Sequence, residues 1–207
     1  MSSMKEAFSR LQGEDYDGAL SLVQPIILEE PDNWNALYLA GHCYREKGDL
    51  QNSINYFEKA TSIDRCAPFV WTSLGVSWQL LSDFDKSVSA FNTSIEMKPD
   101  DFDSRNSLGM TYKEMGELEK ALASYEVAQQ ILCDEAYKLA KDQGMAGSSI
   151  SPDGEKTYKL EADFMDFVGN WLKSDARYSI IMNNIGGVYL ELGDREQEIG
   201  RASCRER

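Results

Sequence analysis

Apolar and small residues recur at intervals of three and four along most of this chain, with polar residues between them. Residues 37–44 and 54–60 are two neighbouring examples, separated by a mostly polar stretch that contains a glycine. This spacing places the apolar residues on one face of an α-helix. We therefore predict an all-α fold built from pairs of amphipathic helices, each pair joined by a short turn.

The helical pattern repeats with a period of 34 residues. The segments LAGHCYREKG, SLGVSWQLLS and SLGMTYKEMG begin at residues 39, 73 and 107. The same offset separates three aromatic residues, Phe57, Phe91 and Tyr125, and three small residues, Ala60, Ser94 and Ala128. A period that is kept at so many positions indicates one helix pair stacked repeatedly on copies of itself.

Glycine and proline mark the ends of the predicted helices. Gly48 and Gly116 fall where a first helix must end and turn, in a left-handed conformation that glycine adopts without strain. Ser82 occupies the same position in the middle repeat, where we expect a less comfortable fit. Pro31 and Pro99 end the second helices, because a residue without an N–H group cannot continue a helix.

One repeat carries most of a known family pattern, in the residues Trp71, Leu74, Gly75, Trp78, Ser87, Phe91 and Pro99. They resemble the W-L-G-Y-A-F-P pattern of tetratricopeptide-repeat (TPR) proteins. The resemblance implies an all-α, right-handed superhelical solenoid of antiparallel helix pairs. It also accounts for Gly41, Gly75 and Gly109 in mid-helix, because the partner helix crosses there and the aromatic residues fill the space between neighbouring pairs.

The period divides the chain into seven segments, of which three are well-matched repeats. The predicted boundaries are 1–33 (degenerate first repeat), 34–67, 68–101 and 102–135 (repeats), 136–178 (degenerate repeat with an enlarged loop at about 144–154), 179–197 (first helix of a truncated repeat) and 198–207.

The region after the third well-matched repeat has two interpretations. In the first, a degenerate repeat forms helices at about 134–143 and 155–173, joined by a Gly/Ser/Pro-rich turn. In the alternative, residues 119–143 form one long helix. For the last predicted helix, 179–192, we expect an apolar face without a covering partner, formed by Ile180, Ile181, Ile185 and Val188.

The last nine residues, IGRASCRER, abandon both the helical period and the acidic composition. They match an in-frame translation of a common sequencing adapter, whose preceding bases also supply most of the codon for Glu198, so we interpret residues 198–207 as an artefact. On this interpretation the genuine sequence stops at Gln197, within a repeat, and the natural protein is longer. The alternative is a genuine disordered basic tail.

The net charge limits the partners of this chain. Thirty-five acidic and 21 basic residues give a formal charge of −14, which repels phosphate backbones and anionic lipids. We expect a neutral or basic protein or peptide as partner, and neither nucleic acid nor a membrane. The first 20 residues contain no apolar run long enough for a signal peptide, so we predict a cytoplasmic location, with the nucleus as the alternative.

No group of residues in the sequence suggests catalysis or a cofactor. His42 is the only histidine, and no motif places serine, aspartate or cysteine around it. Cys43, Cys66 and Cys133 have no metal-ligand spacing, so we predict that they are reduced thiols in a helical core. We expect no metal, no cofactor, no small-molecule substrate and no enzymatic activity.

The TPR resemblance implies a concave groove, lined by the first helix of each pair, in which a peptide or a partner helix lies. The corresponding residues are Asn35, Tyr38, His42, Arg45, Phe69, Thr72, Val76, Gln79, Asp103, Asn106, Met110 and Lys113. We therefore predict a protein–protein interaction scaffold. The alternative is the substrate-binding arm of a larger enzyme, such as a peptide-modifying glycosyltransferase, whose catalytic domain is missing.

Overall fold

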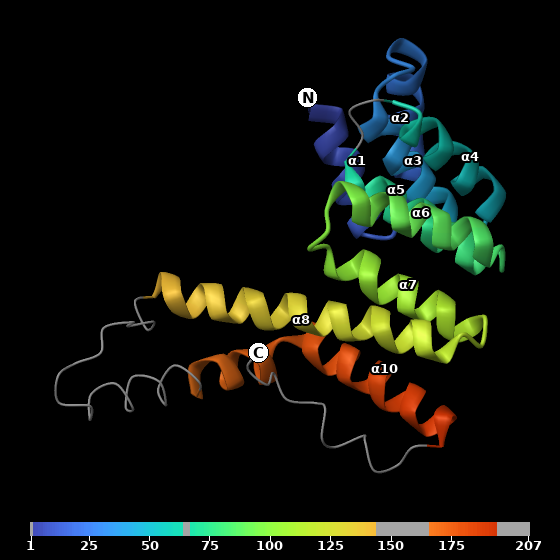
Figure 1. The fold of residues 1–207 in the computed structure, drawn as a ribbon. Coiled ribbons are helices and arrows are strands. Elements are labelled where there is room, and N and C mark those ends of the chain that lie inside the picture. The colour runs from blue at the N-terminus through green and yellow to red at the C-terminus, as the bar shows by residue number, and fades with distance from the viewer. Residues whose placement is uncertain (1, 64–66, 144–165, 194–207) are drawn as a thin grey trace, which may run out of the picture. The chain divides into compact units, whose positions relative to one another are not determined.

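A computed structural model describes residues 2–63, 67–143 and 166–193 of the chain, and every regular element in these ranges is a helix (Figure 1). The chain divides into an N-terminal unit, Met1–Pro99, and a C-terminal unit, Asp100–Arg207. The predicted artefact at 198–207 and the predicted loop at 144–154 lie outside the described residues.

The N-terminal unit consists of three helix pairs. Their bounds are α1 Ser2–Gln12, α2 Tyr16–Glu29, α3 Trp34–Glu46, α4 Leu50–Thr61, α5 Pro68–Leu80 and α6 Phe84–Met97. Each helix packs on the next one in the chain, and the first helices α1, α3 and α5 also contact one another in order. The structure thus confirms the predicted succession of helix pairs in this unit, including the weakly patterned first pair.

Within each pair, an aromatic ring of the second helix lies on a glycine of the first. A Cβ atom added to Gly41 would lie 2.7 Å from the ring of Phe57, and one added to Gly75 would lie 2.7 Å from Phe91. Phe57 and Phe91 are both fully buried. The rings therefore pack against the glycine of their own pair, which explains why these helices tolerate a residue with poor helix propensity.

The turn inside each pair has the same backbone conformation, at positions 34 residues apart. Glu14, Gly48, Ser82 and Gly116 have φ angles of 60°, 79°, 63° and 78°. The expectation that Ser82 is less comfortable than glycine is confirmed, because a left-handed conformation is costly for a residue with a Cβ atom.

The residue after each of these left-handed positions is the N-cap of the second helix. Asp15, Asp49 and Asp83 accept a hydrogen bond from a backbone N–H three residues later, at 2.9, 3.1 and 3.4 Å. An aspartate at this N-cap position satisfies a donor that the helix itself cannot pair. A left-handed residue followed by an acidic cap is therefore part of the repeat in this chain.

The C-terminal unit contains α7 Phe102–Glu114, α8 Leu118–Asp142, a helical stretch at 166–174 and α10 Ala176–Leu192. Its first pair has the same close contact, because a Cβ atom on Gly109 would lie 2.5 Å from the ring of Tyr125. Helix α8 is a single helix of 25 residues. The prediction of a separate helix at about 134–143 is therefore wrong, and the alternative of one long helix is confirmed.

The continuity of α8 has a simple cause. The sequence contains neither glycine nor proline between residues 117 and 143, so nothing ends the helix. Its later part also has a buried stripe of Leu132, Ala136 and Ala140, which continues the same apolar face. The stripe stabilises the extension because it belongs to the core cluster that includes Val168 and Leu172.

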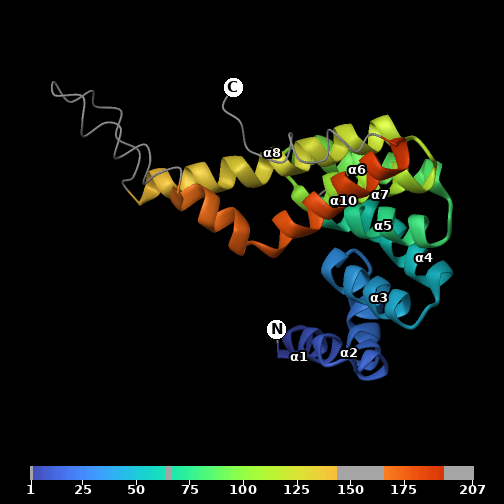
Figure 2. The same ribbon diagram turned by 90° about the horizontal axis from the view of Figure 1, so that it is seen from below.

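Helix α10 packs on α8 and contacts α7, as α5 packs on α4 and contacts α3 (Figure 2). The Asn184 amide donates to Asn106 Oδ1 at 2.8 Å, and Lys113 Nζ lies 2.9 Å from Glu191 Oε1. Both pairs join residues 78 apart in the sequence, so α10 runs parallel to α7. Helix α10 thus follows α7 and α8 as a first helix follows the preceding pair.

The expectation of an uncovered apolar face on this helix is wrong for three of its four residues. Ile181, Ile185 and Val188 are buried in a cluster with residues of α8. Only Ile180, with 49% of its surface exposed, remains accessible. The reason is that the apolar face of α10 points toward the preceding pair, which supplies the cover.

The cysteines give two different outcomes. Cys43 is fully buried and free, as predicted, and burial raises the pKa of its thiol to about 11. Cys133 is also buried, but it takes part in a disulfide, so the prediction of a reduced thiol is wrong there. Cys66 lies outside the described residues.

Replacing Ser82 by glycine should raise the free energy of unfolding by about 1 kcal/mol, because the left-handed backbone no longer strains a residue with a Cβ atom. Urea denaturation measures the change. The matched control is Gly48→Ser, which should lower stability by a similar amount at the equivalent turn. A loss of stability in Ser82→Gly would contradict this account of the turn.

Replacing Gly75 by alanine should lower the free energy of unfolding by about 1–3 kcal/mol, because the new methyl group overlaps the buried ring of Phe91. Helix propensity alone would change stability by about 1 kcal/mol in the opposite direction. Gly169→Ala is the control, since no atom lies within 4 Å of its added Cβ. If both substitutions stabilise the protein, the ring does not require a glycine beneath it.

Candidate functional site

The predicted groove residues fall on the first helices of both units, and each unit is considered alone. Eight lie on α3 and α5 of the N-terminal unit, namely Asn35, Tyr38, His42, Arg45, Phe69, Thr72, Val76 and Gln79. Four lie on α7, namely Asp103, Asn106, Met110 and Lys113. Direct contacts join several members of the first group into one cluster.

Tyr38 is the centre of this cluster. Its ring centroid lies 4.9 Å from that of Phe69 on α5 and 4.9 Å from that of His42, in edge-to-face arrangements. Trp34 extends the cluster, with its centroid 5.8 Å from Phe69. Phe69 keeps 46% of its surface exposed. The neighbouring first helices α3 and α5 therefore form an aromatic surface. Its rings contact one another, and part of the surface remains accessible to solvent.

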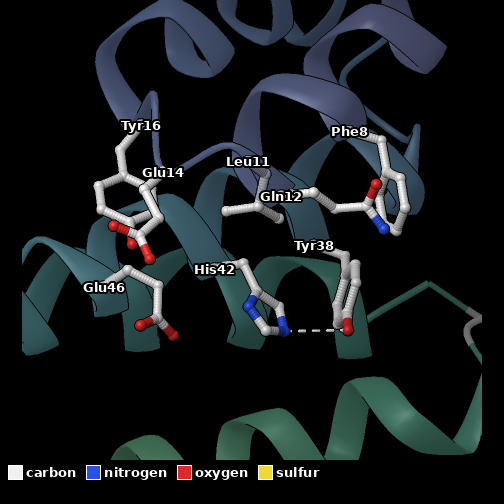
Figure 3. A pocket seen from close by; sticks show the side chains of 8 residues that line it. All are labelled: Phe8, Leu11, Gln12, Glu14, Tyr16, Tyr38, His42 and Glu46. Carbon is white, nitrogen blue, oxygen red and sulfur yellow. Dashed lines mark hydrogen bonds between the residues drawn. The ribbon is translucent and has the colours of Figure 1, made fainter.

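A pocket of about 450 Å³ adjoins this cluster, between α1 and α3 (Figure 3). It is lined by Phe8, Leu11, Gln12, Glu14, Tyr16, Tyr38, His42 and Glu46. Figure 3 shows Phe8 and Tyr38 at one end, Leu11 and His42 in the middle, and Glu14, Tyr16 and Glu46 at the other end. The pocket thus combines an aromatic and aliphatic wall with two carboxylates.

The α1 residues of this pocket were not among the predicted groove residues. Phe8 and Leu11 stand 34 residues before His42 and Arg45, so the period itself assigns them to the same face. The sequence signal was therefore present, but the first helix matches the family pattern weakly. Glu14 lies in the turn and Tyr16 begins the second helix α2. Both were missed because the groove residues were predicted from the first helices alone.

His42 is neutral and fixed by two neighbours. Nη2 of Arg45 lies 3.0 Å from Nδ1 of His42, and Tyr38 Oη lies 3.0 Å from Nε2. Because a guanidinium group only donates, Nδ1 is the acceptor, and Nε2–H then donates to the Tyr38 oxygen. Burial, followed by the charge of Arg45, lowers the pKa of His42 to about 4. At neutral pH the uncharged imidazole therefore forms a fixed part of the pocket lining.

The remaining predicted residues have mixed surroundings. The Thr72 hydroxyl bonds with the Ser94 hydroxyl at 2.9 Å, so this side chain joins α5 to α6. On α7, Asn106 and Lys113 bind residues of α10, as described above. Asp103 and Met110 are exposed. In the C-terminal unit the predicted positions therefore contribute to packing between first helices as well as to the surface.

No group of three or more His, Cys, Asp or Glu side chains in residues 2–63, 67–143 and 166–193 is arranged to hold a metal ion. Among the helices that the structure describes, none has the length and apolar character needed to cross a membrane.

Helix pairs that pack on one another in chain order define an all-α helical-repeat solenoid. Comparison with protein families identifies the kind of repeat. Two family models of the tetratricopeptide repeat match residues 35–65 and 90–123. The chain therefore contains tetratricopeptide repeats at these positions. No curated protein sequence matches it significantly.

Solved structures of TPR proteins share the fold at low sequence identity. A crystal structure of MamA is 18% identical, with a TM-score of 0.65, over 95% of this chain and 90% of that chain. A crystal structure of YrrB, described as a TPR protein with an unusual peptide-binding site, is 15% identical with a TM-score of 0.62. That match covers 97% of this chain and 81% of YrrB.

The stability of the N-terminal unit should depend on the protonation of His42. Its pKa is lowered from 6.5 to about 4 on folding, so the unfolded chain takes up the proton first as the pH falls. The free energy of unfolding should therefore be nearly independent of this group above about pH 7.5 and fall by about 2 kcal/mol between pH 7 and pH 5.

Comparison with His42→Gln isolates this effect from the titration of the carboxylates. The difference in unfolding free energy between the parent and His42→Gln, measured by urea denaturation, should shift by that amount over the same pH interval. A difference that stays constant from pH 7 to pH 5 would show that His42 titrates alike in the folded and unfolded chains.

Proposed function

We propose that the first-helix face of the N-terminal unit binds an extended peptide segment of a partner protein. TPR repeats are interaction scaffolds, whose first helices offer a continuous surface to a partner. The residues that carry this proposal are Tyr38 and Phe69, with His42 and Arg45 beside them. The four α7 residues stay predicted members of the same kind of face.

The aromatic cluster is the observation that supports this function best. An exposed Phe69 costs free energy in water, and the cluster around it is already ordered by ring contacts with Trp34 and Tyr38. A pre-ordered aromatic surface loses little entropy when a ligand covers it. The pocket between α1 and α3 adds a concave site for a side chain next to this surface.

The chemistry of the partner follows from charge. The formal charge of −14 disfavours acidic segments and favours neutral or basic ones, especially during encounter. The alternative function, a substrate-binding arm of a larger enzyme, would use the same face. It stays a prediction, and the sequence of the intact gene beyond the codon for Gln197 tests it.

Selection of displayed random dodecapeptides against the full chain tests the proposal. Selected peptides should bind the parent protein, and Phe69→Ala should weaken their binding about tenfold or more, because it removes a central aromatic anchor. Phe69 is 46% exposed and lies outside the buried core clusters, so we expect its loss to leave the fold intact.

The control is Leu28→Ala, which removes an apolar side chain that is 83% exposed on the second helix α2. It should leave affinity unchanged. A selection without binders, or binders that are insensitive to Phe69→Ala, would contradict a peptide-binding role for this face.

A further inference from the structure

The pocket between α1 and α3 has two chemically different ends. Phe8, Leu11 and the ring of His42 form an apolar wall along its length, and half of the Phe8 surface is exposed. Glu14 and Glu46 lie at the far end, together with Tyr16 (Figure 3). A long side chain with an apolar stem and a charged tip matches this succession of surfaces.

The charge at this end is negative. Glu46 Oε1 lies 3.3 Å from Nη2 of Arg45, so a cation of the protein partly neutralises that carboxylate. Glu14 has no ion pair among the described residues. Burial raises the pKa of the Tyr16 hydroxyl, and the charges of Glu14 and Glu46 add to this rise. A cation is therefore favoured there and an anion is disfavoured.

Glu14 is a non-glycine residue at a turn position where glycine would be more favourable, so the fold does not explain its presence. It holds the left-handed turn position with a φ angle of 60°, where Gly48 and Gly116 stand in two other pairs and Ser82 stands in the third. This conformation costs a residue with a Cβ atom about 1–2 kcal/mol relative to glycine. The turn would be more stable with glycine, yet the carboxylate that replaces it lines the pocket.

We propose that this pocket binds a lysine or arginine side chain of the peptide held by the N-terminal unit. The stem lies along Leu11, Phe8 and the imidazole of His42, and the cation pairs with Glu14 and Glu46. Gln12, an exposed residue of the pocket lining, offers an amide to the peptide backbone. This inference rests on the proposed function, because the side chain belongs to the peptide on the same face.

The key variant is Glu14→Gly, which removes the carboxylate and the left-handed strain together. It should raise the free energy of unfolding while it weakens binding. The probes are selected dodecapeptides whose binding depends on Phe69, each made with its basic residue intact and with that residue replaced by norleucine. Affinity for the basic peptide should fall about tenfold, and affinity for the norleucine peptide should not change.

Ser82→Gly is the matched control, since it relieves the same strain at a turn outside the pocket. It should raise stability without changing either affinity. Glu46→Gln should weaken only the basic peptide, and higher salt should weaken binding to the parent protein more than to Glu14→Gly.

The outcomes separate the two proposals. If Phe69-dependent peptides show no preference for lysine or arginine, or if Glu14→Gly leaves their affinity unchanged, the basic pocket is wrong and the peptide face stands. If no selected peptide depends on Phe69, the proposed function fails and this pocket loses its ligand with it.

Discussion

The contact between a glycine of the first helix and an aromatic ring of the second determines how each helix pair is built. In three successive pairs the ring lies so close to the glycine that a methyl group would overlap it. The two helices can approach this closely only because the glycine has no side chain. Since each ring is fully or almost fully buried, the contact holds the pair together and fixes which face of the first helix points inward.

The neighbouring face of the first helices, beside this contact, remains partly accessible for other chemistry. In the N-terminal unit it holds Tyr38, His42 and Phe69, whose rings contact one another across α3 and α5. The same inward packing brings α1 beside α3 and leaves the pocket between them. A scaffold that uses a constant interior to display a variable exterior is typical of repeat proteins. Here the exterior combines aromatic rings with carboxylates.

Much of the fold could be predicted from the sequence because its cause is local and periodic. The 34-residue period identified the helix pairs, the left-handed turns and the glycines under the rings. The errors arose where the period is interrupted. The continuity of α8 was visible in the absence of glycine and proline from 117 to 143, but alignment to the period favoured a break. The cover of Ile181 by α8 depends on tertiary packing, which no local pattern contains.

The candidate site was only partly predictable for a related reason. Periodicity assigns residues to a face, so it found Tyr38, His42 and Phe69, but it does not say which neighbours complete a pocket. Asking which turns lack a glycine would have found Glu14, together with Ser82. The protonation and hydrogen bonds of His42 depend on burial and on Arg45, and these follow only from coordinates.

Hydrogen–deuterium exchange of the full chain, with and without a selected peptide, tests the central claim that the first helices of the N-terminal unit form the binding face. We expect the peptide to slow the exchange of backbone amides in α1, α3 and α5. No comparable change is expected in α4 and α6. Protection concentrated in the second helices, with α3 and α5 unchanged, would contradict it.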